Sequence, residues 1–136
     1  GLAEALDDAL GPDDDITVEP VTGSWDLPGA RLLDLVAVMD RLRSPGGCPW
    51  DAAQTHESLV EYLVEEAYET VEAIETDDDD ALREELGDLL LQVVFHARIA
   101  QEHDAPWTVD DVAAGIVDKL VARHPHVFAD AVERSA

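Results

Sequence analysis

The sequence predicts an all-α domain that resembles a four-helix bundle. Apolar residues recur at helical spacing in four segments after residue 30, and no segment shows the alternation expected of a half-buried strand. The connections are short and rich in Gly, Pro or Asp, which favours antiparallel neighbours. We therefore expect one helical domain over residues 30–136. Residues 1–29, broken by "GPDDD" and "PVTGSWDLPG" after one short helix over 2–10, are expected to form a peripheral arm or linker.

The first two helices of the domain have clear start and stop signals. Helix one is predicted from residue 31 by five apolar side chains at helical spacing, which are Leu32, Leu35, Val36, Met39 and Leu42. The segment "SPGG" (44–47) ends it, and "SPGGCPWDAAQT" (44–55) reads as a loop. A long helix follows from about residue 57 to residue 75.

The second half of the chain continues the helical pattern. The Asp-rich segment "TDDDD" (76–80) predicts a turn that leads into another long helix over about 81–102. "DAPW" breaks that helix, and Thr108 with Asp111 is typical of the capping box that starts a helix. Pro125 is expected to end this last helix. The two long helices would thus form a hairpin across the Asp run.

Composition limits the partners and the compartment. Of 136 residues, 46% are hydrophobic, which is typical of a folded domain, while 8 Lys and Arg face 32 Asp and Glu for a formal charge of -24. This charge disfavours nucleic acid as a partner, because phosphate backbones are bound by cations. The single cysteine, Cys48, indicates a reducing compartment such as the cytoplasm. No apolar run approaches membrane-spanning length, so no membrane partner is expected.

A helical wheel divides the first long helix into three faces. The predicted core face comprises Val60, Leu63, Val64, Ala67, Val71 and Ile74. One flank is acidic and expected to be solvated, with Glu61, Glu65, Glu72 and Glu75. On the other side Glu66 is grouped with Leu59, Tyr62 and Ala73, and Glu69 lies at the edge of this group. A carboxylate on such a partly apolar face needs a partner.

The second long helix is apolar around nearly its whole circumference, which predicts burial and association with another copy. One narrow polar stripe interrupts it, consisting of Glu85, Asp88, Gln92 and His96. Two carboxylates on a buried helix are costly unless they are paired or bound to metal. Gly87 between them costs helix propensity, so close packing or the approach of a ligand would explain it. His96 is expected to form a hydrogen bond inside the bundle.

Folding the hairpin brings Glu66 and Glu69 level with Glu85 and Asp88. Four carboxylates in one cavity suit Mg²⁺, with Mn²⁺ as a substitute, and a magnesium ion that also binds substrate phosphates would make this an active site. The alternative is two solvated acidic faces. A ferritin-like site would require Glu-x-x-His twice and an EF-hand would require Gly at the sixth loop position, and the sequence has neither pattern.

Four segments resemble the MazG nucleoside triphosphate pyrophosphohydrolases: "GGCPWDAAQTHESL", "EEAYE", "REELGDLLLQVVFHARIA" and "DKLVARHPHVF". The resemblance covers about residues 31–130. It implies a homodimer of helical subunits, with a tetramer as the alternative, that uses Mg²⁺ to hydrolyse nucleoside triphosphates to monophosphate and pyrophosphate. The family's metal ligands map onto Glu66, Glu69, Glu85 and Asp88. Glu65 also belongs to the motif, and we expect it to act indirectly or to position water.

The remaining site predictions concern the substrate. Lys119 and Arg123 share one face of the last helix and are expected to hold phosphate oxygens, with surface ion pairing as the alternative. Trp50 either stacks on the base or anchors its loop, and Cys48 is expected to be structural. The leading hypothesis is a hydrolase of broad base tolerance that removes unwanted nucleotides. The alternatives are a narrower dUTP or dCTP pyrophosphatase and a non-catalytic helical module that binds a protein.

Overall fold

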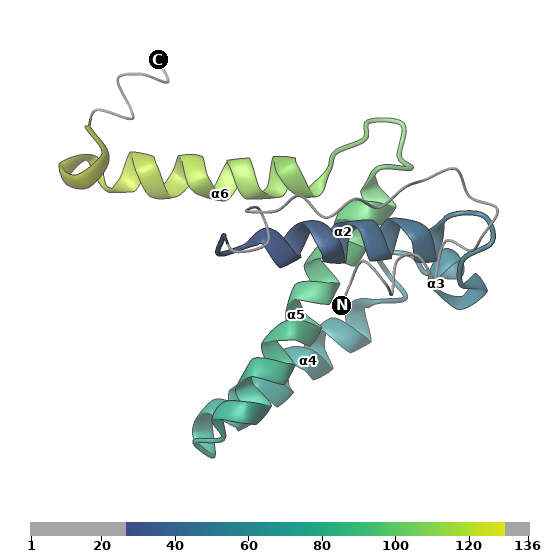
Figure 1. Cartoon of the computed structure of the whole chain (residues 1–136), viewed down its shortest axis with the longest axis horizontal. Helices are drawn as coiled ribbons and strands as arrows, with labels where there is room; N and C mark the ends of the chain where they lie inside the picture. The colour runs from purple at the N-terminus through teal and green to yellow at the C-terminus, as the bar shows by residue number, and fades with distance from the viewer. Residues whose placement is uncertain (1–26, 130–136) are drawn as a thin grey trace. The chain divides into compact units, whose positions relative to one another are not determined.

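The computed structural model describes residues 27–129, and all regular structure within that range is helical, which confirms the predicted all-α class (Figure 1). The helices are α2 (Ala30–Arg43), α3 (Pro49–Ala53), α4 (Val60–Glu75), α5 (Asp79–Ala100) and α6 (Val109–Arg123). The predicted helix over 2–10, the rest of the arm up to residue 26 and residues 130–136 lie outside the described residues. The chain divides into two compact units, and the boundary between them falls in the sequence between residues 96 and 97.

The helix α2 ends where its glycines predicted, but the following loop contains a helix that the sequence did not reveal. The segment "PWDAA" forms α3, with Pro49 at its first position, where a missing N–H costs nothing. The Arg43 side chain reaches back and donates hydrogen bonds to the carbonyl oxygens of Asp51 (2.6 Å) and Gln54 (3.0 Å). This satisfies backbone acceptors at the end of α3. Helix propensity alone could not predict this short helix, because the carbonyl groups at its end accept hydrogen bonds from an arginine that lies outside it.

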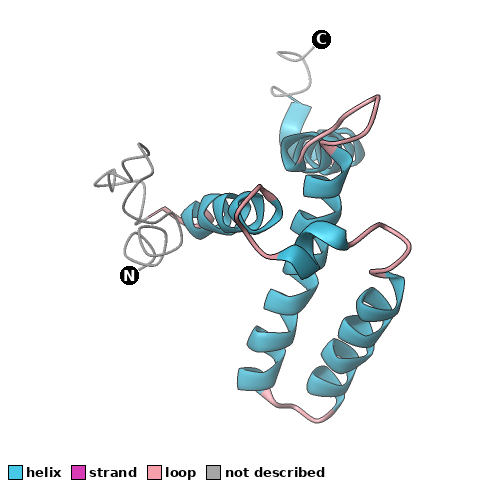
Figure 2. Ribbon diagram, turned by 90° about the vertical axis from the view of Figure 1, so that its right-hand side faces the viewer, coloured by secondary structure: helices cyan, strands magenta, loops and turns pink. Residues whose placement is uncertain are grey.

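The two long helices form the predicted antiparallel hairpin (Figures 1 and 2). The helix α4 begins at Val60, three residues later than expected, because Thr55 and Ser58 hydrogen-bond each other's backbone N–H in a local turn (3.1 and 2.9 Å). In the turn after α4, Asp77 adopts a left-handed conformation with φ of 56°. The carboxylate of Asp78 then accepts a hydrogen bond from the Ala81 N–H at 3.1 Å and caps α5.

The face of α4 that was predicted to form the core is exposed in this chain. Val60, Val64 and Ile74 keep 54%, 49% and 59% of their surface, while the buried residues of α4 are Thr70 and Ala73, which share a face with Glu66. The burial predicted for the whole circumference of α5 is also wrong, since Leu86, Leu90 and Val93 are exposed. The reason is that α4 and α5 turn their carboxylate-bearing faces toward each other, so their apolar faces point outward.

The apolar core of the first unit lies at the opposite end of the hairpin from the Asp-rich turn. Its best-buried side chains are Met39 of α2, Leu59 before α4, and Val94 and Phe95 of α5. In the second unit, α6 begins at the predicted capping box, in which the Thr108 N–H donates to the Asp111 carboxylate at 2.8 Å. It ends at Arg123, before Pro125 as predicted. None of the helices described is long and apolar enough to span a membrane.

Candidate metal centre

Three of the four predicted metal ligands converge between α4 and α5. Oxygen atoms of Glu66, Glu85 and Asp88 all lie within 4.8 Å of one another. Glu85 and Asp88 are three residues apart on α5 and therefore share a face, and Glu66 approaches from the facing side of α4. The antiparallel hairpin thus brings carboxylates from both helices to one point, as the sequence predicted.

The burial of these carboxylates is the feature that favours a cation. Glu66, Glu85 and Asp88 are each half-buried. The Oε2 atoms of Glu66 and Glu85 are fully covered, and neither has a hydrogen-bond partner among residues 27–129. Leaving charged oxygens buried and unpaired is costly. An all-oxygen set with two unsatisfied atoms fits a hard divalent cation such as Mg²⁺, and the metal-binding role of the set stays a prediction.

The electrostatics of the cluster lead to the same interpretation. Burial raises the pKa of Glu85 to about 7, assisted by a hydrogen bond with the Glu69 carboxyl and by the negative charges of Glu69, Asp88 and Glu66. The pKa of Glu66 is also raised, first by burial and then by the charges of Asp88 and Glu69. In the metal-free protein Glu85 is therefore partly protonated near neutral pH. A divalent cation would replace that proton.

Glu69, the fourth predicted ligand, is more exposed than the other three and adjoins the cluster, since its carboxyl interacts with those of Glu66 and Glu85. Glu69 and Glu85 also line a cavity of about 370 Å³ that extends toward the hairpin turn. Glu72 and Asp78 contribute further carboxylates to its wall. The cluster is thus reached from an open and acidic side.

The polar stripe of α5 continues beyond Asp88 to Gln92 and His96. Gln92 is buried, with 6% of its surface exposed, and its Oε1 has no hydrogen-bond partner in the part of the chain that the structure describes. The Nδ1 atom of His96 lies 2.7 Å from Nδ1 of His56 and the two rings stack, which confirms its predicted bond inside the bundle. Burial, and then the charge of His56, lower the pKa of His96.

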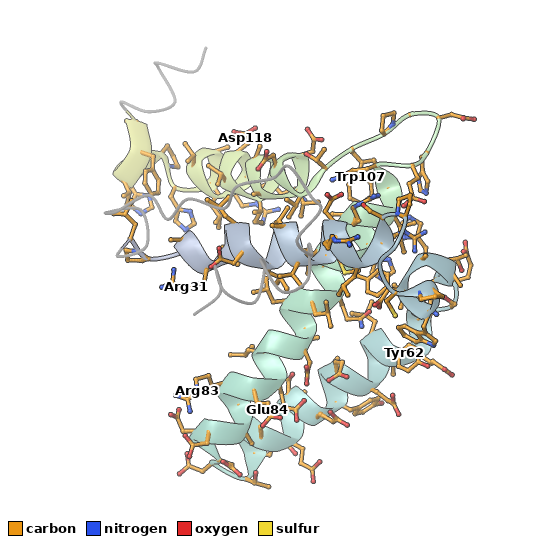
Figure 3. All side chains as sticks on the ribbon, turned by 45° about the vertical axis from the view of Figure 1, so that its right-hand side comes forward. Arg31, Tyr62, Arg83, Glu84, Trp107 and Asp118 are labelled. Atoms are coloured by element: carbon orange, nitrogen blue, oxygen red, sulfur yellow. The ribbon has the colours of Figure 1, made fainter. Side chains whose placement is uncertain are left out.

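The other predicted site residues lie apart from this cluster or in the second unit. Glu65 is exposed on the neighbouring flank of α4. Trp50 lies on α3 rather than on a loop, is 52% exposed, and contacts Tyr62 of α4 edge to face with ring centroids 6.0 Å apart; Figure 3 shows Tyr62 in the first half of α4. Lys119 and Arg123 are exposed on α6. Their substrate-binding roles stay predictions.

Sequence reasoning placed Gln92 on the polar stripe but gave it no function. The signal was present, because Gln92 lies four residues after Asp88 and is the only polar residue between Asp88 and His96. What the sequence could not show is that this amide is buried with an unsatisfied acceptor. That property depends on the neighbours that the tertiary structure provides.

The fold and the site define an all-α protein whose helical hairpin gathers carboxylates suited to a divalent cation. Residues 54–128 match the family model of the MazG nucleotide pyrophosphohydrolase domain, and the chain belongs to this family, as the sequence segments indicated.

Two of the curated relatives carry names that agree with this family. The chain is 58% identical over 102 residues, 75% of its length, to the nucleoside triphosphate pyrophosphohydrolase/pyrophosphatase MazG of Thermotoga maritima, of which it covers 40%. It is 55% identical over 102 residues, 74% of its length, to the nucleoside triphosphate pyrophosphohydrolase of Mycobacterium tuberculosis, of which it covers 31%. An uncharacterized 26.1 kDa protein in the blaB 3′ region of Streptomyces cacaoi is 58% identical over 139 residues. That alignment spans this whole chain and 57% of the relative, so the chain covers between 31% and 57% of these three proteins.

Proposed function

We propose that this chain hydrolyses nucleoside triphosphates to nucleoside monophosphate and pyrophosphate, by attack of water on the α-phosphate. The reaction would depend on Mg²⁺, with Mn²⁺ as a substitute, tolerate different bases, and remove unwanted nucleotides. The observation that carries the proposal is the convergence of Glu66, Glu85 and Asp88, with two unsatisfied buried oxygens. Membership of the MazG family and the names of its relatives support the reaction type.

In this proposal Glu66, Glu69, Glu85 and Asp88 hold the metal. Bound there, Mg²⁺ would screen the phosphate charges and lower the pKa of a water molecule. The residues of the chain supply the rest. The hairpin holds its carboxylates in place before substrate arrives, so little reorganisation is needed. Glu85, whose pKa is raised to about 7, would release its proton when the cation binds. Glu65 is proposed to position water from the neighbouring flank, and Lys119 and Arg123 to hold phosphate oxygens.

A homodimer is part of the proposal, with a tetramer as the alternative. The supporting observation is the exposed apolar side of the hairpin, formed by Val60, Leu63, Val64, Val71, Ile74, Leu86, Leu90 and Val93. Exposed apolar residues gathered on one hairpin favour association with another chain when they form a contiguous surface. A second copy of the chain would cover the faces that the sequence pattern predicted to be buried. The cytoplasmic location stays a prediction that rests on the single cysteine.

The direct test measures pyrophosphate release from every ribo- and deoxyribonucleoside triphosphate, with and without Mg²⁺. Release from all bases, only with the cation, is the expected result. Release confined to dUTP or dCTP would favour the narrower pyrophosphatase. No release from any nucleotide would overturn the proposal in favour of a non-catalytic module that binds a protein.

A further inference from the structure

We propose that Gln92 determines sugar specificity, by accepting a hydrogen bond from a ribose hydroxyl of the bound nucleotide on its Oε1 atom. The inference rests on the proposed function and goes beyond it, because it assigns the side of the cluster on which the nucleoside lies. Its basis is the position of Gln92 on α5, its unsatisfied acceptor, and the distribution of charge along the seam between α4 and α5.

The position of Gln92 suits a group next to the reacting phosphate. Gln92 follows Asp88 by four residues, so the two side chains leave the same face of α5 about 6 Å apart along the helix axis. The α-phosphate and the sugar hydroxyls of a nucleotide are separated by a comparable length. With the phosphates at the cluster, a sugar directed along α5 therefore reaches Gln92.

The unsatisfied Oε1 acceptor of Gln92 indicates that a partner is needed. Gln92 Oε1 is buried and has no hydrogen-bond partner within residues 27–129. Such a group costs free energy and calls for a water or ligand partner. Gln54, the other buried glutamine of the described chain, has both ends of its amide satisfied. Its Nε2 donates to the Trp50 carbonyl at 2.9 Å, and its Oε1 accepts from the Ser58 hydroxyl at 2.7 Å.

The charge distribution along the seam gives the nucleotide a direction. On the side of the turn, the cavity wall carries Glu69, Glu72 and Asp78, which suits a triphosphate neutralised by divalent cations. On the other side lie Gln92 and then the stacked pair of His56 and His96. Burial favours the neutral form of His96 by lowering its pKa. An uncharged nucleoside is better placed against the side of Gln92, which carries no carboxylate, than against the acidic wall.

The register of the hairpin keeps Gln92 between two observed contacts. Glu66 meets Asp88 at the cluster, and His56 meets His96 at the far end of the seam. Gln92 lies between these two levels on α5. A sugar hydroxyl donates hydrogen bonds whatever base it carries, so recognition by Gln92 is compatible with the proposed tolerance of different bases.

The test compares kcat/KM for pyrophosphate release from a ribonucleoside triphosphate and from its 2′,3′-dideoxy counterpart with the same base. We expect the unmodified protein to prefer the ribonucleotide about tenfold, the value of one neutral hydrogen bond. Gln92→Leu should abolish this preference by slowing the ribonucleotide alone. Gln54→Leu is the matched control and should keep the preference. The 2′-deoxy and 3′-deoxy nucleotides then identify which hydroxyl donates.

The unfolding midpoint distinguishes a role of Gln92 in substrate recognition from a structural role. Removing the buried and unsatisfied Oε1 acceptor should leave the unfolding midpoint of the metal-free protein unchanged or raise it in Gln92→Leu, whereas Gln54→Leu should lower the midpoint. A lowered midpoint in Gln92→Leu would show that the amide has structural partners and would overturn the inference.

The kinetic outcomes also distinguish this inference from the proposed function. Equal kcat/KM for the two nucleotides in the unmodified protein, or a preference that survives in Gln92→Leu, would overturn the inference while pyrophosphate release leaves the proposed function intact. No release from any nucleotide would overturn the proposed function, and the sugar assignment with it.

Discussion

The Oε2 atoms of Glu66 and Glu85 lie buried on facing helices of one hairpin, and neither finds a hydrogen-bond partner among the residues that the structure describes. Around them the hairpin has its polar residues inside and many of its apolar residues outside. A single chain gains little stability from this arrangement. The arrangement becomes favourable if a cation binds between α4 and α5 and another copy of the chain covers their exposed apolar faces. Each of these two conditions can be tested.

The first prediction concerns the ligands. Asp88→Ala removes one of three converging carboxylates and should lower the rate of pyrophosphate release by more than about a hundredfold, because even residues that only support a metal ligand are worth ten- to a hundredfold. The helical circular dichroism spectrum should stay unchanged. Glu75→Ala, at an exposed position of α4, is the control and should keep its activity. Full activity in Asp88→Ala would remove this residue from the metal site.

The second prediction follows from the raised pKa of Glu85. Because the pKa rises from 4.5 in the unfolded chain to about 7 in the folded one, the folded state binds the proton more tightly. The associated stability is complete below pH 4.5 and is lost as the pH rises through about 7. Denaturation of metal-free protein over this range should show the loss, and Glu85→Gln should reduce it. At pH 8, Mg²⁺ should raise the stability of the unmodified protein by binding the folded state, and Glu85→Gln should weaken this effect.

The third prediction has the opposite sign and concerns His96. Its pKa is lowered on folding, so the associated stability is present above pH 6.5 and is lost as the pH falls through the folded pKa. His96→Phe keeps a ring against His56 but cannot be protonated. As the pH falls from 7 to 5, the free energy of unfolding of this variant should therefore decrease less than that of the unmodified protein. The exposed His126→Phe serves as the control; an identical pH dependence in all three proteins would contradict the prediction.

The fourth prediction tests the exposed apolar side of the hairpin. Val71 is 48% exposed on α4, and Val71→Asp would place a charge in the proposed interface between copies. Light scattering should show a shift from dimer to monomer. Glu72→Asp introduces the same residue at the next, exposed position and should remain dimeric. A dimer that persists in Val71→Asp would exclude this face as the interface.

The fifth prediction compares two glycines. A Cβ atom at Gly47 would lie 2.3 Å from the carbonyl oxygens of Arg41 and Leu42, so Gly47→Ala should destabilise the fold by about 1–3 kcal/mol. At Gly87 a Cβ meets nothing within 4 Å in the described chain, which does not support the close packing expected there.

Gly87→Ala should therefore stabilise α5 by about 0.5–1 kcal/mol through helix propensity. Chemical denaturation measures both changes. A loss of association in Gly87→Ala would instead indicate that another copy packs closely against this position.

The amino-acid sequence by itself determined the helices, the hairpin and the polar stripe on α5. Apolar spacing and the turn residues placed α2, α4, α5 and α6 to within about three residues, and Thr108 with Asp111 marked the start of α6 correctly. The stripe that carries Glu85 and Asp88 was also evident, because the angle between side chains on one helix follows from its period.

Only the tertiary structure decided which faces meet. A wheel gives the relative directions of side chains on one helix, but burial depends on the neighbouring elements. The wheel therefore predicted that the apolar face of α4 forms the core, whereas the structure buries Ala73 on the face of Glu66 and leaves Val64 exposed. The formation of α3 and the unsatisfied Oε1 atom of Gln92 depend in the same way on the tertiary surroundings, which local periodicity does not encode.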